Sequence, residues 1–155
     1  MDELNRKFAV LLKIAHVLNE NQVLWAVGGS MLLYFKGKTD VFHDIDLMVG
    51  EKDIEKARGL LLSMGELSPE HPDNESGKYK TRHFLEFHID GVDVDVMAGL
   101  VIVRDGKEYD CSLLEEQVAE RIPLKGEPIP LQALSDWRRY YELMGRTSKV
   151  EMIDK

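Results

Sequence analysis

The chain has 155 residues, which suits one domain with a real core rather than two, so we expect residues 1–155 to form a single domain. Twenty basic and twenty-eight acidic side chains give a formal net charge of −8, which argues against an extended nucleic-acid surface. The single cysteine, Cys111, cannot form an internal disulfide, and no signal peptide or membrane-length apolar run is visible, so we expect a cytoplasmic protein without a membrane partner.

The chain begins with an amphipathic pattern. Over residues 2–19, apolar side chains such as Leu4, Leu11 and Leu18 recur at helical spacing, which predicts a supporting helix. A polar turn then leads into residues 23–27, an almost unbroken apolar run. Such a run is typical of a strand that is buried on both faces.

A glycine turn follows this strand. Gly28 and Gly29 allow a sharp turn and leave room for a bulky ligand, and Ser30 is well placed to open a short helix over residues 31–35. The free backbone N–H groups of a helix start favour an anion, most often phosphate. We therefore expect Gly28, Gly29 and Ser30 to bind phosphate groups.

Two aspartates stand fourteen and sixteen residues after Ser30. On a strand, Asp44 and Asp46 point to one face, while Ile45 and Leu47 point to the other. Two neighbouring carboxylates repel each other unless a divalent cation lies between them. Asp44 and Asp46 are therefore candidate metal ligands.

A second helix is expected over residues 52–64, with Gly65 as its stop. Residues 68–79 contain two prolines, a glycine and many polar side chains, and are predicted as a loop. Two interpretations stay open for this loop: a plain connection or a lid near the site.

A β-hairpin is predicted over residues 84–97, because Asp90-Gly91 separates two alternating runs. A two-residue turn fixes the register, so Glu86 faces Asp95 and His88 faces Asp93. One face of the hairpin is then acidic. The other face is apolar and buried: Leu85, Phe87, Ile89, Val92, Val94 and Val96.

The remaining third alternates between strands and helices. Asp105-Gly106 predicts another hairpin over residues 100–111, and Gly145 predicts the end of a helix. The other expected elements are a short helix at 112–120 capped by Ser112, a turn-rich strand region at 121–130, a helix at 131–144, and one more turn or helix at 146–153. The segment at about 131–153 would close the domain.

The set formed by Gly29-Ser30, Asp44-Ile45-Asp46 and the later VDVDVMAG run resembles the nucleotidyltransferase superfamily with the DNA polymerase β type of catalytic domain. The resemblance covers residues 23–99, and Gly145-Arg146 with Lys149 loosely matches the closing helix of its small members. It is consistent with the fold that the pattern predicts: α/β, or α+β, a small mixed sheet with helices on one face and the acidic strands on the other.

The resemblance implies a metal-dependent enzyme. It would move a nucleoside monophosphate from a nucleoside triphosphate, with ATP expected, to a small-molecule or protein acceptor, and release pyrophosphate. Asp44, Asp46 and Asp95 would be catalytic residues that hold Mg²⁺ or Mn²⁺, with Asp95 also taking the proton of the acceptor. The acidic composition would suit a cationic acceptor such as an aminoglycoside.

Several alternatives stay open at this stage. Asp93 is the second choice for the third carboxylate, and His88 is expected to pair with Asp93 rather than to join it and His43 in a zinc site. Four basic residues near the C-terminus would suit either a triphosphate or plain surface charge: Arg138, Arg139, Arg146 and Lys149. The rival functions are a non-catalytic nucleotide sensor or antitoxin-like partner and a metal-dependent phosphohydrolase.

Overall fold

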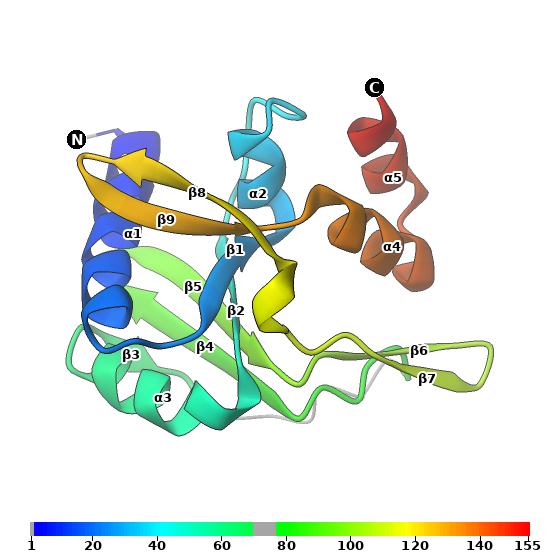
Figure 1. The fold of residues 1–155 in the computed structure, drawn as a ribbon, viewed down its shortest axis with the longest axis horizontal. Helices are drawn as coiled ribbons and strands as arrows, with labels where there is room; N and C mark the ends of the chain where they lie inside the picture. The colour runs from blue at the N-terminus through cyan, green and yellow to red at the C-terminus, as the bar shows by residue number, and fades with distance from the viewer. Residues whose placement is uncertain (1, 70–76) are drawn as a thin grey trace.

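The computed structural model describes residues 2–69 and 77–155, so most of the predicted loop at 68–79 lies outside the described residues. Within them, helices and strands alternate up to residue 62, a run of strands follows, and two helices end the chain (Figure 1). The strands are β1 (Trp25–Gly28), β2 (Ile45–Val49), β3 (Glu66–Leu67), β4 (His83–Ile89), β5 (Val92–Ala98), β6 (Val101–Arg104), β7 (Lys107–Asp110), β8 (Val118–Leu124) and β9 (Glu127–Gln132). The α-helices are α1 (Glu3–Glu20), α2 (Gly29–Phe35), α3 (Ile54–Leu62), α4 (Leu134–Met144) and α5 (Thr147–Asp154), with 3₁₀ turns at Glu51–Asp53 and Glu115–Gln117.

A mixed sheet forms the centre of the described structure, with seven strands in the order β3-β4-β5-β2-β1-β9-β8. The pairs β2–β5 and β1–β9 are parallel, and the other pairs are antiparallel. The predicted fold class, a mixed α/β domain, is therefore confirmed.

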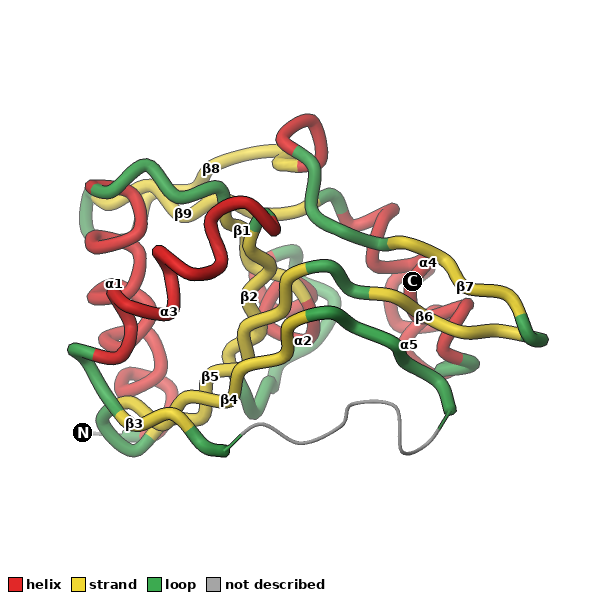
Figure 2. The backbone as a smooth tube through the Cα atoms, turned by 90° about the horizontal axis from the view of Figure 1, so that it is seen from below, coloured by secondary structure: helices red, strands yellow, loops and turns green. Residues whose placement is uncertain are grey.

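Helices α1 and α3 contact each other, and α1 also packs on β9 and β5 (Figures 1 and 2). The side chains of α1 that face the sheet are fully buried: Val10, Leu11, Ile14, Ala15 and Leu18. Helix α2 leads directly from β1 and contacts β2, while α4 contacts α5 and the β6–β7 hairpin. No helix in the described part of the chain is both long and apolar enough to cross a bilayer.

The predicted β4–β5 hairpin is confirmed, including its register. Asp90 and Gly91 form the turn with φ values of 50° and 81°, the left-handed conformation that this turn needs. Glu86 faces Asp95 and His88 faces Asp93. The six side chains expected on the apolar face are all at most 2% exposed.

The second predicted hairpin forms β6 and β7, which are separate from the main sheet. Arg82, just before β4, ties this hairpin to the domain. Its guanidinium donates two hydrogen bonds of 2.8 Å to the Glu51 carboxylate and one of 3.0 Å to Asp110. Ser112, predicted as a helix cap, instead accepts a hydrogen bond from Arg82 and donates one to Asp110.

The prediction of a helix at 112–120 was wrong. Only a 3₁₀ turn forms there, and the chain enters the edge strand β8, which pairs with β9 through a turn at Lys125 and Gly126. Edge strands tolerate proline, so Pro123 does not prevent this pairing. The missed signal was the Lys-Gly pair between two strand-like runs.

Other boundaries also moved. Residues Leu131 and Gln132, expected to open the last long helix, continue β9, where Leu131 pairs with Val27. The second helix is shorter than predicted, since it ends at Leu62, and the two-residue strand β3 then follows without having been foreseen. In each case tertiary pairing with the sheet decided the outcome over local periodicity.

Candidate active site

The site is built on two adjacent parallel strands. Asp46 on β2 and Asp95 on β5 are register partners, so their side chains leave the sheet at the same level. The apolar neighbours Ile45, Leu47, Val94 and Val96 are fully buried on the opposite face. The alternation of polar and apolar residues along each strand therefore brings the two carboxylates together.

Burial and mutual repulsion raise the pKa values of both carboxyl groups. The pKa of Asp46 rises to about 8, mainly because burial disfavours the charge and also because Asp95 and Asp44 lie near. The pKa of Asp95 rises to about 7, mainly through burial and then through Asp44, Glu86 and Asp93. Such a cluster favours any ligand that brings positive charge between the carboxylates.

Asp44 lies in the bend just before β2 rather than on the strand itself. It acts electrostatically on both Asp46 and Asp95. The preceding loop is anchored by Lys7 of α1, whose buried ammonium donates a 2.7 Å hydrogen bond to the carbonyl of Phe42. This contact fixes the backbone two residues before Asp44.

Because Gly28 and Gly29 have no side chains, two other side chains of the protein can pack closely against the turn. A Cβ on Gly28 would lie 2.4 Å from the Trp137 ring, and one on Gly29 would lie 2.2 Å from Oδ2 of Asp46. The space predicted for a bulky ligand is therefore partly filled by these side chains. Gly29 also has a φ of +59°, which favours glycine.

Ser30 is not the helix cap that the sequence suggested. Helix α2 begins at Gly29 with Gly28 as its N-cap, and no side chain caps it. Ser30 instead lines a cavity of about 280 Å³ together with Asp44, Asp46, Arg146 and Lys149. The helix already begins within the glycine turn, so the start of α2 lies two residues earlier than predicted.

Arg146 and Lys149 form the cationic side of this cavity. Both lower the pKa of Asp46, which shows that their charges act on its carboxylate. The pKa of Lys149 is itself lowered, mainly by burial and then by the nearby Arg146. Two cations held this close favour an anionic ligand between them.

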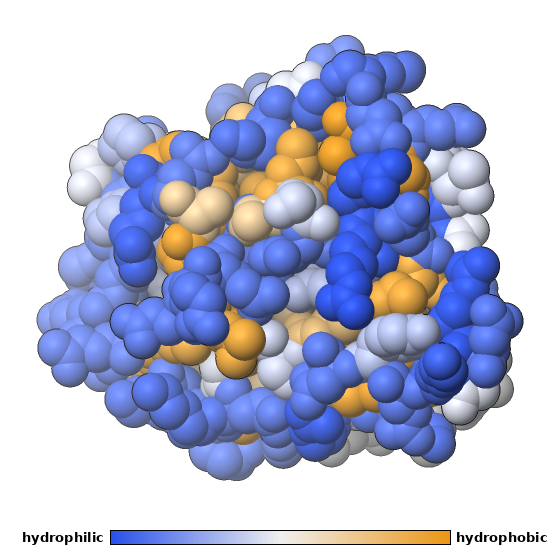
Figure 3. All heavy atoms as spheres, turned by 45° about the vertical axis from the view of Figure 1, so that its right-hand side comes forward, coloured by the Kyte–Doolittle hydropathy of each residue, from blue (hydrophilic) through white to orange (hydrophobic). Residues whose placement is uncertain are grey.

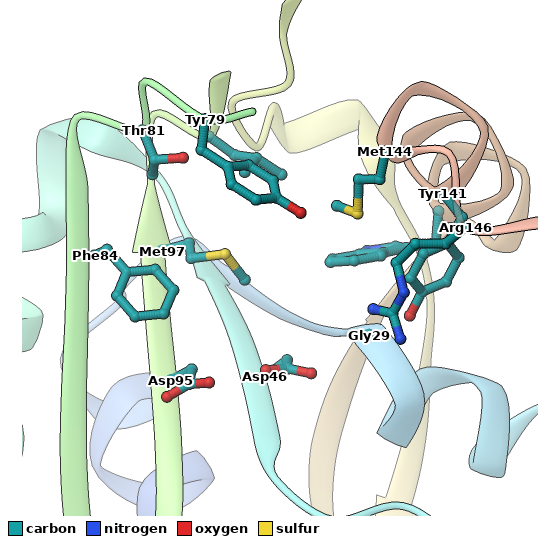
Figure 4. A pocket seen from close by; sticks show the side chains of 12 residues that line it. Gly29, Asp46, Tyr79, Thr81, Phe84, Asp95, Met97, Tyr141, Met144 and Arg146 are labelled. Atoms are coloured by element: carbon teal, nitrogen blue, oxygen red, sulfur yellow. The ribbon is translucent and has the colours of Figure 1, made fainter. Parts of the chain in front are cut away.

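A second cavity of about 330 Å³ shares Asp46, Tyr141 and Arg146 with the first. Figure 4 shows Asp46 and Asp95 at its floor, Phe84 and Met97 on one side, and Tyr141 and Arg146 on the other. Figure 3 turns the right-hand side of Figure 1 toward the reader, and hydrophobic residues are visible there between hydrophilic ones. Its lining residues are Gly29, Asp46, Tyr79, Thr81, Phe84, Asp95, Met97, Leu100, Trp137, Tyr141, Met144 and Arg146.

The Trp137 ring in this second cavity is held in place from behind. Its Nε1 donates a 3.0 Å hydrogen bond to Oε1 of Gln132, which is 1% exposed. The Nε2 of Gln132 donates in turn to the hydroxyl of Tyr140 at 3.0 Å. Because the indole N–H is already bonded, Trp137 offers the cavity an apolar ring and no donor.

The carboxylates have the chemistry of a magnesium site. Asp46 and Asp95 provide hard oxygen ligands side by side, and their pKa values are raised mainly by burial and then by the neighbouring carboxylates. Within residues 2–69 and 77–155, no three His, Cys, Asp or Glu side chains are placed to hold one ion. Mg²⁺ is commonly held by one or two carboxylates together with substrate phosphates, so the pair suits an ion that enters with a nucleotide.

The histidines near the acidic face have other roles. Nδ1 of His88 lies 2.7 Å from Oδ1 of Asp93, which confirms the expected cross-strand pair. His43 lines the cationic cavity instead. Asp93, the second choice for a third carboxylate, is thus engaged by His88, whereas Asp95 faces the cavity and Asp46.

The C-terminal contribution to the site was only partly foreseen. Arg146 and Lys149 were left open between triphosphate contacts and surface charge, and the structure places both beside Asp46. Arg138 instead pairs with Asp154 on the surface. Trp137 and Tyr141 fall within the helix predicted at 131–144, and their spacing alone gave no sign that they line a cavity.

Comparisons with known proteins agree with this architecture. No protein-family model and no curated protein matches the sequence. A Thermotoga maritima protein classed provisionally as a nucleotidyltransferase superposes with a TM-score of 0.73 and 24% identity, over 99% of this chain and 93% of that one.

Two structures of the antibiotic-resistance factor ANT(2″)-Ia also match. The one in complex with adenylyl-2″-tobramycin gives a TM-score of 0.63 at 14% identity, over 96% of this chain and 86% of that one. The solution structure gives 0.57 at 12%, over 99% and 89%. Since all three similarities extend along nearly the whole chain, we conclude that the protein has the nucleotidyltransferase fold.

Proposed function

We propose that the protein is a metal-dependent nucleotidyltransferase that moves a nucleoside monophosphate from a nucleoside triphosphate, with ATP expected, to a small-molecule acceptor. The observation that carries the proposal is the register pairing of Asp46 with Asp95 beside the cationic pair Arg146 and Lys149. Carboxylates for a metal and cations for a triphosphate thus adjoin each other. The fold is the one in which ANT(2″)-Ia binds an adenylylated antibiotic.

The chemistry assigns a role to each group. The acceptor oxygen attacks the α-phosphorus, the bond from that phosphorus to the bridging oxygen breaks, and pyrophosphate leaves. Asp95 takes the proton of the acceptor, because its carboxylate lines the cavity beside Asp46. Asp46 and Asp95 would hold Mg²⁺ or Mn²⁺, which would supply positive charge against the developing negative charge, and the nearby charge of Asp44 would strengthen that hold.

The other end of the donor meets the cationic cavity. Arg146 and Lys149 would neutralise the β- and γ-phosphates, and the Ser30 hydroxyl is available as a further hydrogen-bond donor. Gly28 and Gly29 would contribute through their backbone and through the absence of side chains. This arrangement leaves the α-phosphate above Asp46, between the two cavities.

The test is pyrophosphate release. The full chain is incubated with labelled ATP, with Mg²⁺ or Mn²⁺, and with a pool of small-molecule acceptors. We expect metal-dependent release together with a labelled acceptor. ATP binding without release would instead indicate a nucleotide sensor, and release of inorganic phosphate without pyrophosphate would indicate a hydrolase of another kind.

A further inference from the structure

The two cavities meet at Asp46, and they differ in chemistry. The cationic cavity contains Arg146 and Lys149, whereas the second cavity has Asp95 at its floor and aromatic or thioether side chains around it. Arg146 borders both. Both cavities contain apolar side chains, and Tyr141 also lines both, so they differ by Lys149 in the first and Asp95 in the second. A ligand that spans Asp46 therefore has two cations at one end and, at the other, Asp95 with a mostly aromatic and thioether lining.

The direction in which pyrophosphate leaves determines which of the two cavities holds the acceptor. In phosphoryl-type transfer the attacking and leaving oxygens are roughly in line on opposite sides of the phosphorus. If pyrophosphate leaves toward Arg146 and Lys149, the acceptor oxygen must approach from the side of Asp95. The second cavity is then the acceptor site.

On the side of this cavity formed by β4 and β5, called the strand wall, the side chains next to the Asp95 carboxylate are apolar. Phe84 and Met97 are register partners on β4 and β5, on the same face as Asp95 and Glu86 and about 7 Å further along the strands. The opposite wall consists of Trp137 and Tyr141. The rings Trp137 and Tyr141 contact each other at 5.4 Å between centroids, so this wall is a packed aromatic surface.

The charged side chains that line the cavity offer few partners for a polycationic ligand. Its charged lining residues are Asp46, Asp95 and Arg146. Both carboxylates are committed to metal and proton transfer under the proposed function, and the third group is itself a cation. The volume of about 330 Å³ is near the lower end for small-molecule sites, which suits one compact ring system.

We propose that the acceptor is a compact, flat, largely apolar molecule with a hydroxyl group, rather than a polycationic sugar. This inference rests on the proposed function and specifies its substrate class. The ring lies between the Phe84–Met97 pair and Trp137, and its hydroxyl points toward Asp95. The hydroxyl oxygen forms the new bond to the α-phosphorus, its proton passes to Asp95, and pyrophosphate leaves toward Arg146.

The experiment compares 2-naphthalenemethanol with tobramycin as acceptors for the full-length protein, with ATP and Mg²⁺. We expect mass spectrometry to show an adenylyl adduct of the alcohol, with kcat/KM at least tenfold above that for tobramycin. In Phe84→Ala the KM for the alcohol should rise roughly five- to tenfold, because a ring contact is lost. The KM for ATP should change much less.

Leu62→Ala is the matched control, because Leu62 is 47% exposed on α3, away from both cavities. It should leave both KM values unchanged. Preference for tobramycin would overturn the inference. So would a rise in KM for ATP alone in Phe84→Ala, because that result would place the nucleobase in this cavity.

Binding is measured separately through quenching of tryptophan fluorescence by 2-naphthalenemethanol. Failure of the alcohol to bind overturns the inference, whether or not pyrophosphate is released. Absence of pyrophosphate release with every acceptor, water included, overturns the proposed function instead. Binding that Phe84→Ala weakens would in that case still support an apolar, ring-binding cavity.

Discussion

The strand side and the helical side of the site were built in different ways. On the strand side, Asp46 and Asp95 are placed by the alternation of β2 and β5 and by a two-residue turn. On the helical side, Trp137, Arg146 and Lys149 arrive only because α4 packs against α2 and β6, and α5 packs against α4 (Figure 1). The first arrangement follows from local rules, whereas the second depends on packing between distant segments.

This difference has a functional meaning under the proposed reaction. The strand side would hold the reacting centre, which needs rigid geometry, and strands inside a seven-stranded sheet provide it. The helical side would bind the triphosphate through Arg146 and Lys149 and the acceptor ring through Trp137. Substitutions of Asp46 and Asp95 on the strand side should therefore affect turnover, and those on the helical side should affect substrate affinity.

The largest effect is expected on the strand side. Asp46→Asn and Asp95→Asn should each lower kcat by roughly 10³-fold or more, because several kcal/mol of charge stabilisation in the transition state is lost. Neither change should lower the melting temperature of the metal-free protein, since each removes a repelling buried charge. Pyrophosphate release and thermal denaturation measure the two outcomes.

Asp93→Asn is the control for these variants, because Asp93 lies on the same face of β5 and pairs with His88. It should retain most of the activity. If Asp93→Asn abolished turnover while Asp95→Asn retained it, the assignment of the third carboxylate would be reversed.

A smaller effect is expected on the helical side. Arg146→Ala and Lys149→Ala should each raise the KM for ATP roughly 10- to 100-fold, since a charged hydrogen bond contributes about 1.5–3 kcal/mol. The kcat should fall less than in the aspartate variants. Steady-state kinetics at varied ATP concentration measures both parameters.

Arg138→Ala is the matched control for the cations, because Arg138 lies on α4 but forms its ion pair with Asp154 at 2.7 Å on the surface. Its KM for ATP should stay near the wild-type value. Equal effects of all three substitutions would mean that general charge, rather than position, attracts the nucleotide.

The contact between the two sides can be broken at Gly28. In Gly28→Ala the new methyl group would overlap the Trp137 ring, so we expect a loss of roughly 1–3 kcal/mol in the free energy of unfolding. Gly59→Ala is the comparison, because a Cβ there meets open space within helix α3. That variant should gain about 0.5–1 kcal/mol. Urea denaturation measures both, and equal stabilities would contradict the packing described.

The last prediction concerns the pH dependence of stability. The pKa of Asp46 is raised to about 8 and that of Asp95 to about 7, above the usual values near 4. Between about pH 4 and pH 8 the folded protein therefore binds more protons than the unfolded chain. The stability of the metal-free protein should therefore be full below about pH 4 with respect to these groups and fall as the pH rises toward 8. Each kcal/mol lost should lower the melting temperature by roughly 2–4 °C.

This pH effect is measured by thermal denaturation in the presence of a chelator. The slope should be smaller in Asp46→Asn than in the wild type. Excess Mg²⁺ should also reduce it at pH 8. An unchanged slope in the variant would show that the Asp46 carboxylate is not the group responsible.

The features that the sequence predicted well depend on short-range rules. The β4–β5 register followed from Asp90-Gly91 and strict alternation, and it placed Asp95 opposite Glu86 as expected. The proximity of Asp46 to Asp95 also depended on β2 and β5 being neighbours. No local rule dictates that pairing, and the family resemblance supplied it.

The features that were missed depend on long-range packing. Ser30 was taken for a cap, but the helix begins earlier because Gly29, with its positive φ, turns directly into α2 beside Asp46. Helix 112–120 was lost to pairing with β9, whose position next to β1 no local signal reveals. Likewise, the aromatic wall could not be read from the sequence, because Trp137 reaches the cavity only through its contact with Gly28 and its hydrogen bond to Gln132.

The most direct test of the central claim is a crystal structure with Mn²⁺ and a non-hydrolysable ATP analogue. We expect an anomalous Mn²⁺ signal between the carboxylates of Asp46 and Asp95. The triphosphate should extend toward Arg146 and Lys149, and the second cavity should be left for the acceptor. A triphosphate bound away from Arg146 and Lys149, or a metal ion bound elsewhere than at Asp46 and Asp95, would contradict it.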